Sequence, residues 1–424
     1  MPQAHTTQAQ PSMTAPAKFP PLRSLDDALV ELLHRIEPLQ GTQTVSTFDA
    51  DRRVLARSIS SAMQVPGFDN SAMDGYALRT ADCTQPAPVL RVAQRIAAGH
   101  FGQPLLAGQA ARIFTGAPMP PGADAVVMQE DCTDLGDGTV RINTQPRIGQ
   151  WLRRAGEDIA HGAVVLEQGT LLSPASLGLA ASIGMAALEV VRPVKVALFS
   201  TGDELVMPGD VAPSALPPGA IYNSNRFFLR ALLQRAGCDV TDMGIVPDNR
   251  AATLAALQAA AQQHDMIVTS GGVSVGEEDH IKPAVQQLGS LDLWSISMKP
   301  GKPFAYGKVG AAHFVGLPGN PVSSFVTFVM LVRPMLAALQ GQPKAVSTTK
   351  TVAARADFNW PRADKRREFL RVKRNAQGGL DLYPNQSSGV LTSAVWADGL
   401  VDNAAGSTIV QGQMVAYIDF ASLF

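Results

Sequence analysis

The spacing of hydrophobic residues changes repeatedly from the period of a strand to that of a helix in the middle of the chain. Short apolar runs predict strands, whereas apolar residues three or four positions apart predict helices. The predicted strands are Val194–Phe199, Val240–Val246, Met266–Ser270 and Leu293–Met298, and the predicted helices are Arg226–Ala236, Ala251–Gln263 and Ile281–Leu288. Strands that alternate with helices indicate βαβ units, so this region is predicted to be an α/β domain with a mostly parallel sheet.

The flanking regions have different patterns. Helical spacing predicts helices from Ser24 to Ile36, at Arg52–Ile59 and at Pro174–Ile183. Short β-like runs predict strands at Val89–Val92, Ala111–Phe114, Ala125–Met128 and Thr139–Ile142, and further strands between Val352 and Phe420. We therefore expect a disordered tail (1–21), an elongated N-terminal scaffold domain (22–50 with 148–193), an inserted small β domain (51–147), the α/β domain (194–341) and a small β-barrel or sandwich (342–424).

Composition adds few constraints. The 424 residues carry a net charge of −1, which gives no argument for a nucleic-acid or membrane-surface partner. The three cysteines lie far apart without the paired spacing of a zinc or redox site, and we interpret them as buried thiols of a reducing compartment. The longest uncharged run, Leu171–Leu188, is interrupted by Pro174, Gly178 and Gly184, which disfavours a membrane span. Residues 1–21 lack the apolar segment of a signal peptide. A cytoplasmic protein that spans no membrane is expected.

Three rigid or glycine-rich corners follow strand-like runs between Asp265 and Pro321. The run Met266–Ser270 leads directly into Gly271–Gly276, and later corners are Lys299–Pro303 and Gly316–Pro321. Ligands of open α/β sheets bind at the edge where the strands end. Backbone amides, carboxylates and ammonium groups gathered there would suit an anionic ligand and a metal, so we predict the active site at this edge.

Acidic residues follow the first three strands of this region. Asp203 and Glu204 come after the first strand, Asp248 after the second and Asp279 after the third. Solvated loop residues and helix caps would give the same pattern. However, Mg²⁺ prefers carboxylate oxygens together with substrate phosphates, and the recurrence at one edge favours a magnesium site.

The two other corners supply positive charge and backbone donors. Lys299 and Lys302 are flanked by Pro300 and Pro303, which restrict the backbone and would preorganise an anion site. Glycines after Ser270 allow the backbone N–H groups to approach an oxyanion closely, although an ordinary tight turn would look the same. Asn320 and Pro321 are suited to begin a helix as its N-cap and first residue.

The segment Gly272–Gly276 also matches the G-x-S-x-G pattern of serine hydrolases, with Ser274 as nucleophile and His313 as a distant base. The context is unfavourable. Two glycines separate the strand from Val273, and the acidic run Glu277–Asp279 would oppose an oxyanion nearby. A hydrolase is therefore the weaker interpretation.

Several motifs resemble those of the MoeA family, the molybdopterin molybdenumtransferases, which are related to the E domains of gephyrin and of its plant counterpart. The resemblance runs in order from about Leu25 to Phe424. The motifs are Pro66–Tyr76, Thr115–Pro118, Arg154–Asp158, Phe199–Glu204, Ser270–Glu277, Lys299–Phe304 and Gly316–Ser323. The fold implied is a multidomain α/β protein with a central, mostly parallel MogA-like α/β sandwich, an elongated helical and β N-terminal region, an inserted β domain and a C-terminal β-barrel.

The resemblance implies an enzyme that takes adenylylated molybdopterin and molybdate and releases molybdenum cofactor and AMP with Mg²⁺. It implies an elongated homodimer in which the partner's N-terminal half completes each site, and transient contact with a molybdopterin adenylyltransferase. Implied catalytic positions are Asp74, Thr115, Asp158, Glu204, Asp248 and Asp279, the last three also holding the metal. Implied substrate-binding positions are Ser270, Gly271, Gly272, Ser274, Gly276, Lys299, Lys302, Pro318, Gly319, Asn320 and Pro321. Arg154 is a further candidate to attract molybdate.

Two positions depart from the family pattern: Ser295, where a basic residue is frequent, and the loop Asn385–Ser388, which matches only loosely. A scaffold that binds completed cofactor or a partner protein is an alternative function of a different class.

Overall fold

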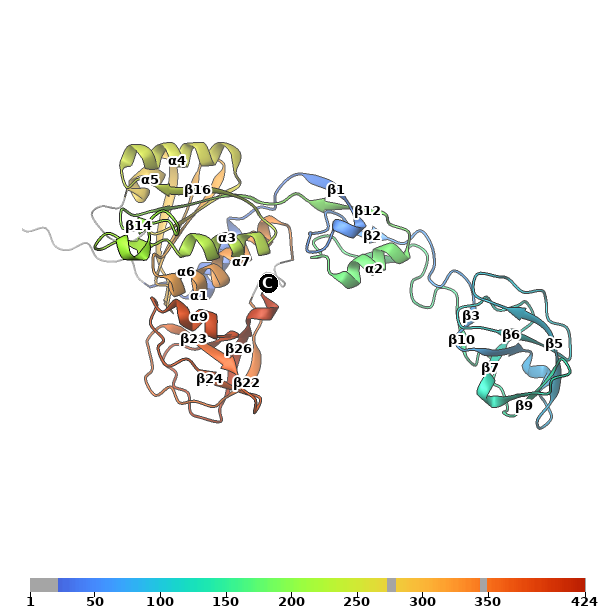
Figure 1. The fold of residues 1–424 in the computed structure, drawn as a ribbon. Helices are drawn as coiled ribbons and strands as arrows, with labels where there is room; N and C mark the ends of the chain where they lie inside the picture. The colour runs from blue at the N-terminus through green and yellow to red at the C-terminus, as the bar shows by residue number, and fades with distance from the viewer. Residues whose placement is uncertain (1–21, 273–279, 344–348, 424) are drawn as a thin grey trace, which may run out of the picture. The chain divides into compact units, whose positions relative to one another are not determined.

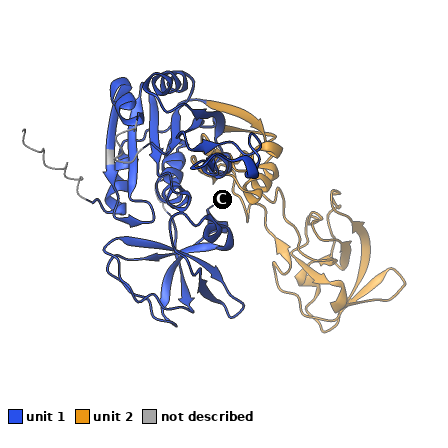
Figure 2. Ribbon diagram, turned by 60° about the vertical axis from the view of Figure 1, so that its left-hand side comes forward, with its two compact units in different colours: residues 1–41, 191–424 blue, residues 42–190 orange. Residues whose placement is uncertain are grey.

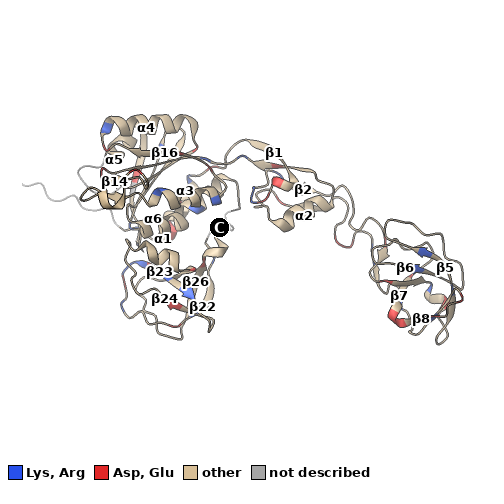
Figure 3. Cartoon of the chain, viewed as in Figure 1, with Lys and Arg blue, Asp and Glu red and all other residues tan. Residues whose placement is uncertain are grey.

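The computed structural model of the chain describes residues 22–272, 280–343 and 349–423. They belong to two compact units (Figure 2): unit 1 comprises Met1–Gly41 with Val191–Phe424, and unit 2 comprises Thr42–Val190. The tail predicted for residues 1–21 lies outside the described residues. Lys and Arg are interspersed with Asp and Glu along both units (Figure 3), in keeping with the net charge of −1.

A six-stranded mixed sheet forms the centre of unit 1, with strand order β16-β13-β17-β21-β20-β18. The first four strands in this order are parallel, and β20 and β18 add antiparallel neighbours. The strands are β13 (Lys195–Thr201), β16 (Asp239–Val246), β17 (Met266–Ser270), β18 (Gly289–Ser295), β20 (Pro303–Val309) and β21 (Ala312–Leu317). The predicted α/β domain is confirmed. One predicted strand, Leu293–Met298, is wrong in its bounds, since β18 ends at Ser295.

Helices cover both faces of this sheet (Figure 1). They are α1 (Leu25–His34), α3 (Asn225–Arg235), α4 (Arg250–Gln263), α5 (Ile281–Leu288), α6 (Pro321–Thr327), the π-helical turn η5 (Phe328–Val332) and α7 (Arg333–Leu339). Alternate residues of β13 point to opposite faces: Leu198 packs in the same core as Leu232 of α3, whereas Phe199 packs in the core that contains Leu257 of α4. Burial of both faces explains why these strands are apolar throughout.

Helix α1 belongs to unit 1, which corrects the domain boundaries predicted from the sequence. Its N-cap is Ser24, whose Oγ accepts a hydrogen bond from the Asp27 N–H at 3.0 Å, as the sequence indicated. Leu25 and Leu32 pack in the core that also holds Met335 of α7. Residues 22–41 therefore do not form a domain with 148–193. The hydrophobic spacing predicted the helix but not which core it packs against.

One helical stretch of the described residues, Pro321–Leu339, is long and apolar enough to cross a membrane by length and composition. Within the structure 83% of it is buried, as for the core helix of a globular unit. Its apolar composition is accounted for by packing inside unit 1.

The C-terminal part of unit 1 is a closed five-stranded barrel, which confirms the predicted barrel. The strands follow one another in the order β23-β24-β22-β26-β25, and β25 pairs back to β23. They are β22 (Val352–Ala356), β23 (Arg367–Arg374), β24 (Gly379–Leu382), β25 (Gly399–Asn403) and β26 (Met414–Asp419), with α9 (Leu391–Trp396) between β24 and β25. The short strand β19 (Met298–Lys299) joins the barrel to the α/β domain by pairing in parallel with β23.

Unit 2 contains a six-stranded sheet in the order β7-β4-β6-β5-β9-β8. The strands are β4 (Gly75–Leu78), β5 (Val89–Ile96), β6 (Gln109–Ile113), β7 (Ala125–Met128), β8 (Cys132–Asp134) and β9 (Thr139–Ile142). Gly75 lies where only glycine fits, because a Cβ there would lie 1.9 Å from the carbonyl oxygen of Val127. The predicted strands of this region are present.

The remainder of unit 2 consists of short paired strands around α2 (Pro174–Ser182). The pairs are β1 (Thr42–Ser46) with β12 (Ala187–Val191), β2 (Ile59–Ser60) with β11 (Val164–Leu166), and β3 (Asn70–Ser71) with β10 (Leu152–Arg153). The predicted helix Arg52–Ile59 is wrong. Its backbone hydrogen-bonds to other segments instead, with the N–H of Leu55 donating to Thr170 O at 2.9 Å. Leu55 and Ile59 pack in the core with Leu172, so pairing with distant segments overrides the local helical spacing.

Candidate active site

The carboxyl ends of the four parallel strands lie side by side at one edge of the unit 1 sheet. Ser200 of β13 is in register with Ile245 of β16 and with Ser270 of β17, and Ser270 is in register with Leu317 of β21. The loops that carry Glu204, Asp248, Gly271–Gly272 and Pro318–Pro321 follow directly. The reasoning that put these predicted residues at one edge therefore agrees with the strand order and register.

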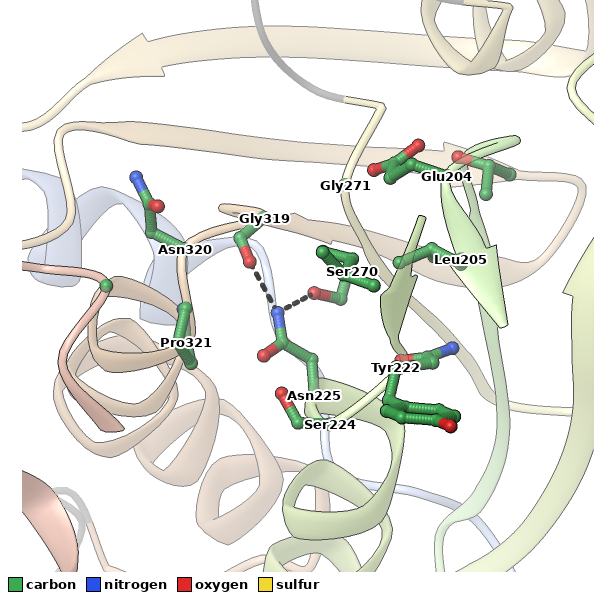
Figure 4. Close-up of a pocket in the computed structure, with 14 residues that line it drawn as sticks. Glu204, Leu205, Tyr222, Ser224, Asn225, Ser270, Gly271, Gly319, Asn320 and Pro321 are labelled. Atoms are coloured by element: carbon green, nitrogen blue, oxygen red, sulfur yellow. Dashed lines mark hydrogen bonds between the residues drawn. The ribbon is translucent and has the colours of Figure 1, made fainter. Parts of the chain in front are cut away.

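A cavity of about 520 Å³ opens at this edge (Figure 4). It is lined by Thr201, Glu204, Leu205, Ile221, Tyr222, Asn223, Ser224, Asn225, Ser270, Gly271, Gly319, Asn320, Pro321 and Gly389. The position follows from the topology. The chain leaves β13 through α3 on one face and returns from β16 to β17 through α4 on the other face, so a crevice forms between β13 and β17.

Asn225 holds two walls of the cavity together. Its Nδ2 donates to Ser270 Oγ at 2.8 Å and to the carbonyl oxygen of Gly319 at 2.6 Å (Figure 4). Ser270 Oγ in turn donates to the carbonyl oxygen of Pro318 at 3.3 Å. The first residue of α3 thus fixes the spacing between the corner after β17 and the corner after β21.

The corner after β17 requires glycine. Gly271 and Gly272 have φ values of 93° and 66°, which L side chains rarely adopt. A Cβ on Gly272 would also lie 2.7 Å from Cγ1 of Ile281, and one on Gly271 would lie 3.2 Å from the carbonyl oxygen of Thr201. The bare backbone of Gly271 therefore forms part of the cavity wall, while its N–H donates to the carbonyl oxygen of Leu317 at 3.1 Å.

Of the three predicted magnesium ligands, only Glu204 is seen at the cavity. Asp248 follows β16 at the same sheet edge but is not a lining residue, and Asp279 lies outside the described residues. Within the described residues, no group of three or more His, Cys, Asp and Glu side chains could hold a metal. The donors that line the cavity, the Glu204 carboxylate and the hydroxyl groups of Thr201 and Ser224, are oxygen ligands that suit Mg²⁺.

The corner after β21 begins α6 as predicted. Asn320 occupies the N-cap position and Pro321 the first helical position. The N–H of Val322 donates to the carbonyl oxygen of Ser388 at 3.0 Å, and the neighbouring Gly389 lines the cavity. The barrel therefore supplies part of the cavity wall, from a loop to which the sequence assigned no role.

Lys299 and Lys302 are not among the lining residues. Lys299 Nζ lies 3.1 Å from Glu368 Oε1 and 3.2 Å from Asp364 Oδ2, both in the barrel domain. Burial lowers the pKa of Lys299, but the hydrogen bonds to these carboxylates outweigh it and leave the pKa above the usual value. Lys299, which was predicted to contact an anionic ligand, is thus paired with two carboxylates of the protein itself.

The unit 2 motifs form a separate cluster of hydrogen bonds. Asp74 Oδ1 accepts from both the N–H and the Oγ1 of Thr115, each at 2.8 Å, which holds the pKa of Asp74 below its usual value. Arg154, expected to be an anion contact, donates to Asp69 at 2.7 Å. Asp158 is exposed, and its N–H donates to the carbonyl oxygen of Val65 at 3.1 Å. Two of the predicted catalytic residues, Asp74 and Thr115, are thus in direct contact.

Within the part of the chain that the structure describes, no geometry supports the serine-hydrolase interpretation. Ser274 and Gly276 lie outside the described residues. The proposed base, His313, is in register with Met266 at the start of β17, at the opposite end of the strand from Ser270. It is buried against Tyr306, 3.0 Å from Nδ1 to the hydroxyl, and burial lowers its pKa to about 4.

The lining residues missed by sequence reasoning are Thr201, Leu205, Ile221, Tyr222, Asn223, Ser224, Asn225 and Gly389. A signal for four of them existed in Tyr222-Asn223-Ser224-Asn225, a largely polar segment that leads into the helix after the first strand of the sheet. No comparable signal marks Gly389. Taken together, the fold and the cavity define a multidomain α/β protein with a ligand site at the topological switch point of a largely parallel sheet.

Comparison with known families gives a consistent assignment along the chain. Residues 23–184 match the model described as MoeA N-terminal region (domain I and II), residues 197–338 match the "Probable molybdopterin binding domain", and residues 353–420 match the MoeA C-terminal region (domain IV). The cavity described above lies mainly in the second of these regions.

Curated relatives cover most of the chain. A molybdopterin molybdenumtransferase of Haemophilus influenzae is 44% identical over 82% of this chain and 85% of its own length. Molybdopterin molybdenumtransferase 2 of Mycobacterium tuberculosis is 37% identical over 88% of this chain and 93% of its own length. A crystal structure of the molybdopterin biosynthesis moeA protein of Pyrococcus horikoshii OT3 aligns with a TM-score of 0.81 at 26% identity, over 94% of this chain and all of that chain. The chain belongs to the MoeA family.

Proposed function

We propose that this chain is a molybdopterin molybdenumtransferase that inserts molybdate into adenylylated molybdopterin and releases AMP in a Mg²⁺-dependent step. The proposal is supported mainly by the agreement between the family assignment and the position of the cavity. Relatives that match most of the chain bear this enzyme name, and the cavity lies in the region matched by the molybdopterin-binding model. Oxygen ligands and bare backbone donors at one sheet edge suit a phosphorylated, anionic substrate.

The residues of the cavity would act by positioning and electrostatics. The backbone donors of Gly319 and Asn320, in the corner after β21, would hold the phosphate and dithiolene parts of the substrate, and the Cβ-free backbone of Gly271 would allow a close approach. Glu204 would hold Mg²⁺ together with Asp248 and Asp279, and the ion when bound offsets negative charge on the pyrophosphate. No protein nucleophile is required.

The unit 2 residues would complete the site from a second copy of the chain, so the working form would be a homodimer with shared active sites. Asp74, Thr115 and Asp158 would then act beside the partner's cavity. Mixing two inactive variants tests this directly. A heterodimer of Asp74→Asn with Glu204→Gln keeps one intact site only if that site combines the two chains, so activity should reappear on mixing. Persistent inactivity of the mixture would place each site within one chain.

The substrate would be delivered by a molybdopterin adenylyltransferase through transient contact, in the cytoplasm. Three free cysteines, two of them buried, are consistent with a reducing compartment. Co-sedimentation of the two purified proteins, with and without adenylylated molybdopterin, would test the contact.

The reaction itself is tested by incubating purified protein with adenylylated molybdopterin, Mg²⁺ and molybdate. The proposal predicts AMP release that depends on molybdate. Binding of completed cofactor without AMP release would favour the scaffold function, and ester hydrolysis lost in Ser274→Ala would favour the hydrolase.

A further inference from the structure

One face of the unit 2 sheet carries two arginines on neighbouring strands. Arg95 of β5 is in register with Arg112 of β6. A register shift within β5 causes this pairing. Val92 is in register with Ala110, so an uninterrupted ladder would place Gln94 opposite Arg112, whereas the extra residue moves Arg95 there. The shift therefore brings two positive charges to the same level of the sheet.

Both guanidinium groups lie against the ring of Phe114. Arg95 Cζ is 4.4 Å and Arg112 Cζ is 4.7 Å from the ring centroid. The backbone that carries the ring is held on both sides, because the Phe114 N–H donates to Ile96 O at 3.3 Å and the Phe114 carbonyl oxygen accepts from the Ala117 N–H at 2.9 Å. Contact with a fixed ring orients the Arg95 side chain before any ligand binds.

Neither arginine forms an ion pair with a carboxylate among the described residues. Arg112 donates instead to the carbonyl oxygen of Gly75 at 2.8 Å and to Gln129 Oε1. Arg95 is exposed, and the contact that the structure gives its side chain is with the Phe114 ring. A guanidinium group in this state can donate two parallel hydrogen bonds to an oxyanion.

The two arginines lie beside the residues of unit 2 that the family resemblance indicates. Phe114 directly precedes Thr115, whose N–H and hydroxyl group donate to Asp74 at 2.8 Å each. The charge of Arg112 contributes to the lowered pKa of Asp74 and is thereby partly compensated. A carboxylate, a hydroxyl group and an exposed guanidinium group are therefore carried by adjoining segments of one sheet.

We propose that Arg95 is a further substrate-binding residue, which binds a tetrahedral oxyanion and reaches the active site on unit 2 together with Asp74 and Thr115. The inference rests on the proposed function, in which unit 2 of one chain completes the cavity of the other. Both substrates offer this chemistry, because molybdate is a tetrahedral oxyanion and adenylylated molybdopterin contains phosphate groups. A residue that only binds the oxyanion should affect KM more than kcat.

The kinetic test is Arg95→Gln in the molybdate-dependent AMP assay. Loss of the charge should raise one KM, for molybdate or for adenylylated molybdopterin, on the order of tenfold, with kcat within about twofold of wild type. The KM that rises identifies the oxyanion. Arg95→Lys keeps the charge without the planar fork and should give an intermediate KM. Arg91 is also exposed on β5, and Arg91→Gln is the matched control that should keep wild-type constants.

Equilibrium dialysis gives a readout that does not depend on turnover. The probes are molybdate and inorganic pyrophosphate, at low ionic strength because salt screens an exposed charge. Binding of the probe that corresponds to the raised KM should weaken about tenfold in Arg95→Gln. It should weaken about threefold in Phe114→Leu, which removes the stacking surface but no charge. Arg91→Gln should bind both probes as the wild-type protein does.

Unchanged KM values together with unchanged probe binding in Arg95→Gln would overturn the proposal. Equal losses in Arg91→Gln would also overturn it, because they would indicate a general effect of net charge. A fall in kcat with both KM values unchanged would contradict a binding role. A wild-type protein that releases no AMP would refute the proposed function, and the dialysis experiment would still decide whether Arg95 binds an oxyanion.

Discussion

The two ends of the parallel strands in unit 1 carry polar residues that are used differently. At the amino ends the polar groups are paired with one another: Arg192 makes two 2.7 Å contacts with Asp265, and His313 contacts Tyr306. At the carboxyl ends Glu204 and Ser270 line a cavity of about 520 Å³. The same strands thus have a structural end and a binding end. Whether a polar residue lies at the amino end or the carboxyl end of a strand therefore indicates its role better than its residue type does.

The largest expected effect is at the binding end. Glu204→Gln keeps the shape of the side chain but removes its charge, so it should reduce AMP release by about a hundredfold, the cost typical of losing one electrostatic contact to the reacting group. The measurement is kcat with saturating Mg²⁺. Asp239→Asn, a carboxylate at the amino end of β16, is the control and should leave kcat unchanged. Equal losses in both variants would remove the distinction between the two ends.

Asn225→Asp should have the next largest effect. The carboxylate cannot donate to Ser270 Oγ or to Gly319 O, and it would face that carbonyl oxygen, so the two walls of the cavity should separate. We expect the KM for adenylylated molybdopterin to rise by about tenfold, which corresponds to the loss of a hydrogen bond worth roughly 1.4 kcal/mol. Asn249→Asp keeps a good N-cap on α4, outside the cavity, and should bind normally. Unchanged substrate affinity in Asn225→Asp would show that this clamp does not shape the site.

At the structural end the effect should appear in stability and not in catalysis. Asp265→Asn removes the charge that pairs with Arg192 and should lower the free energy of unfolding by about 2 kcal/mol, as for other hydrogen bonds to charged groups, with kcat/KM unchanged. Burial alone would raise the pKa of Asp265, but the hydrogen bonds from Arg192 and the Lys195 N–H outweigh it and leave the pKa lowered.

The pH dependence of this difference follows from the direction of the shift. A carboxyl group with a lowered folded-state pKa contributes stability above its unfolded pKa and loses it as the pH falls through the folded value. The stability difference between wild type and Asp265→Asn should therefore be full at neutral pH and shrink below about pH 4. Urea unfolding at several pH values measures it, and a difference that grows on acidification would contradict the assignment.

The smallest effect is expected at the exposed pair in unit 2. Thr115→Val removes the hydroxyl donor to Asp74 and leaves the backbone donor in place. The pKa of Asp74 should rise toward its usual value without reaching it, because the Thr115 N–H is the larger cause of the shift. A carboxyl NMR titration measures this, with Thr139→Val beside Asp137 as a matched pair elsewhere in the unit. An unmoved Asp74 pKa would show that the hydroxyl contact contributes nothing.

Sequence reasoning succeeded where one physical rule linked distant residues. Parallel strands end at a common edge, so runs such as Met266–Ser270 were enough to place Glu204 and Pro318–Pro321 near one another. It failed where the contact partner of a residue is determined only by the tertiary structure. Nothing near Lys299 indicates that Glu368, 69 residues later, takes up its charge. Likewise the helical spacing at Arg52–Ile59 gave no sign that these residues pair with other segments.

Asn225 shows a third kind of limit. An asparagine at the start of a helix is ordinarily interpreted as a cap, but here its side chain bonds to the last residue of β17 and to the loop after β21. The motifs of unit 2 could be recognised only as a resemblance. These motifs are held in place by hydrogen bonds between loops, such as those of Asp74 with Thr115. The spacing of hydrophobic residues cannot predict such contacts.

The most direct test is a crystal structure of the protein soaked with adenylylated molybdopterin, Mg²⁺ and molybdate. The substrate phosphates should lie in the cavity between Thr201, Ser270 and Gly319, with Glu204 turned toward the ion. An ordered substrate bound at the amino ends of the strands, or anywhere that leaves this cavity empty, would contradict the account.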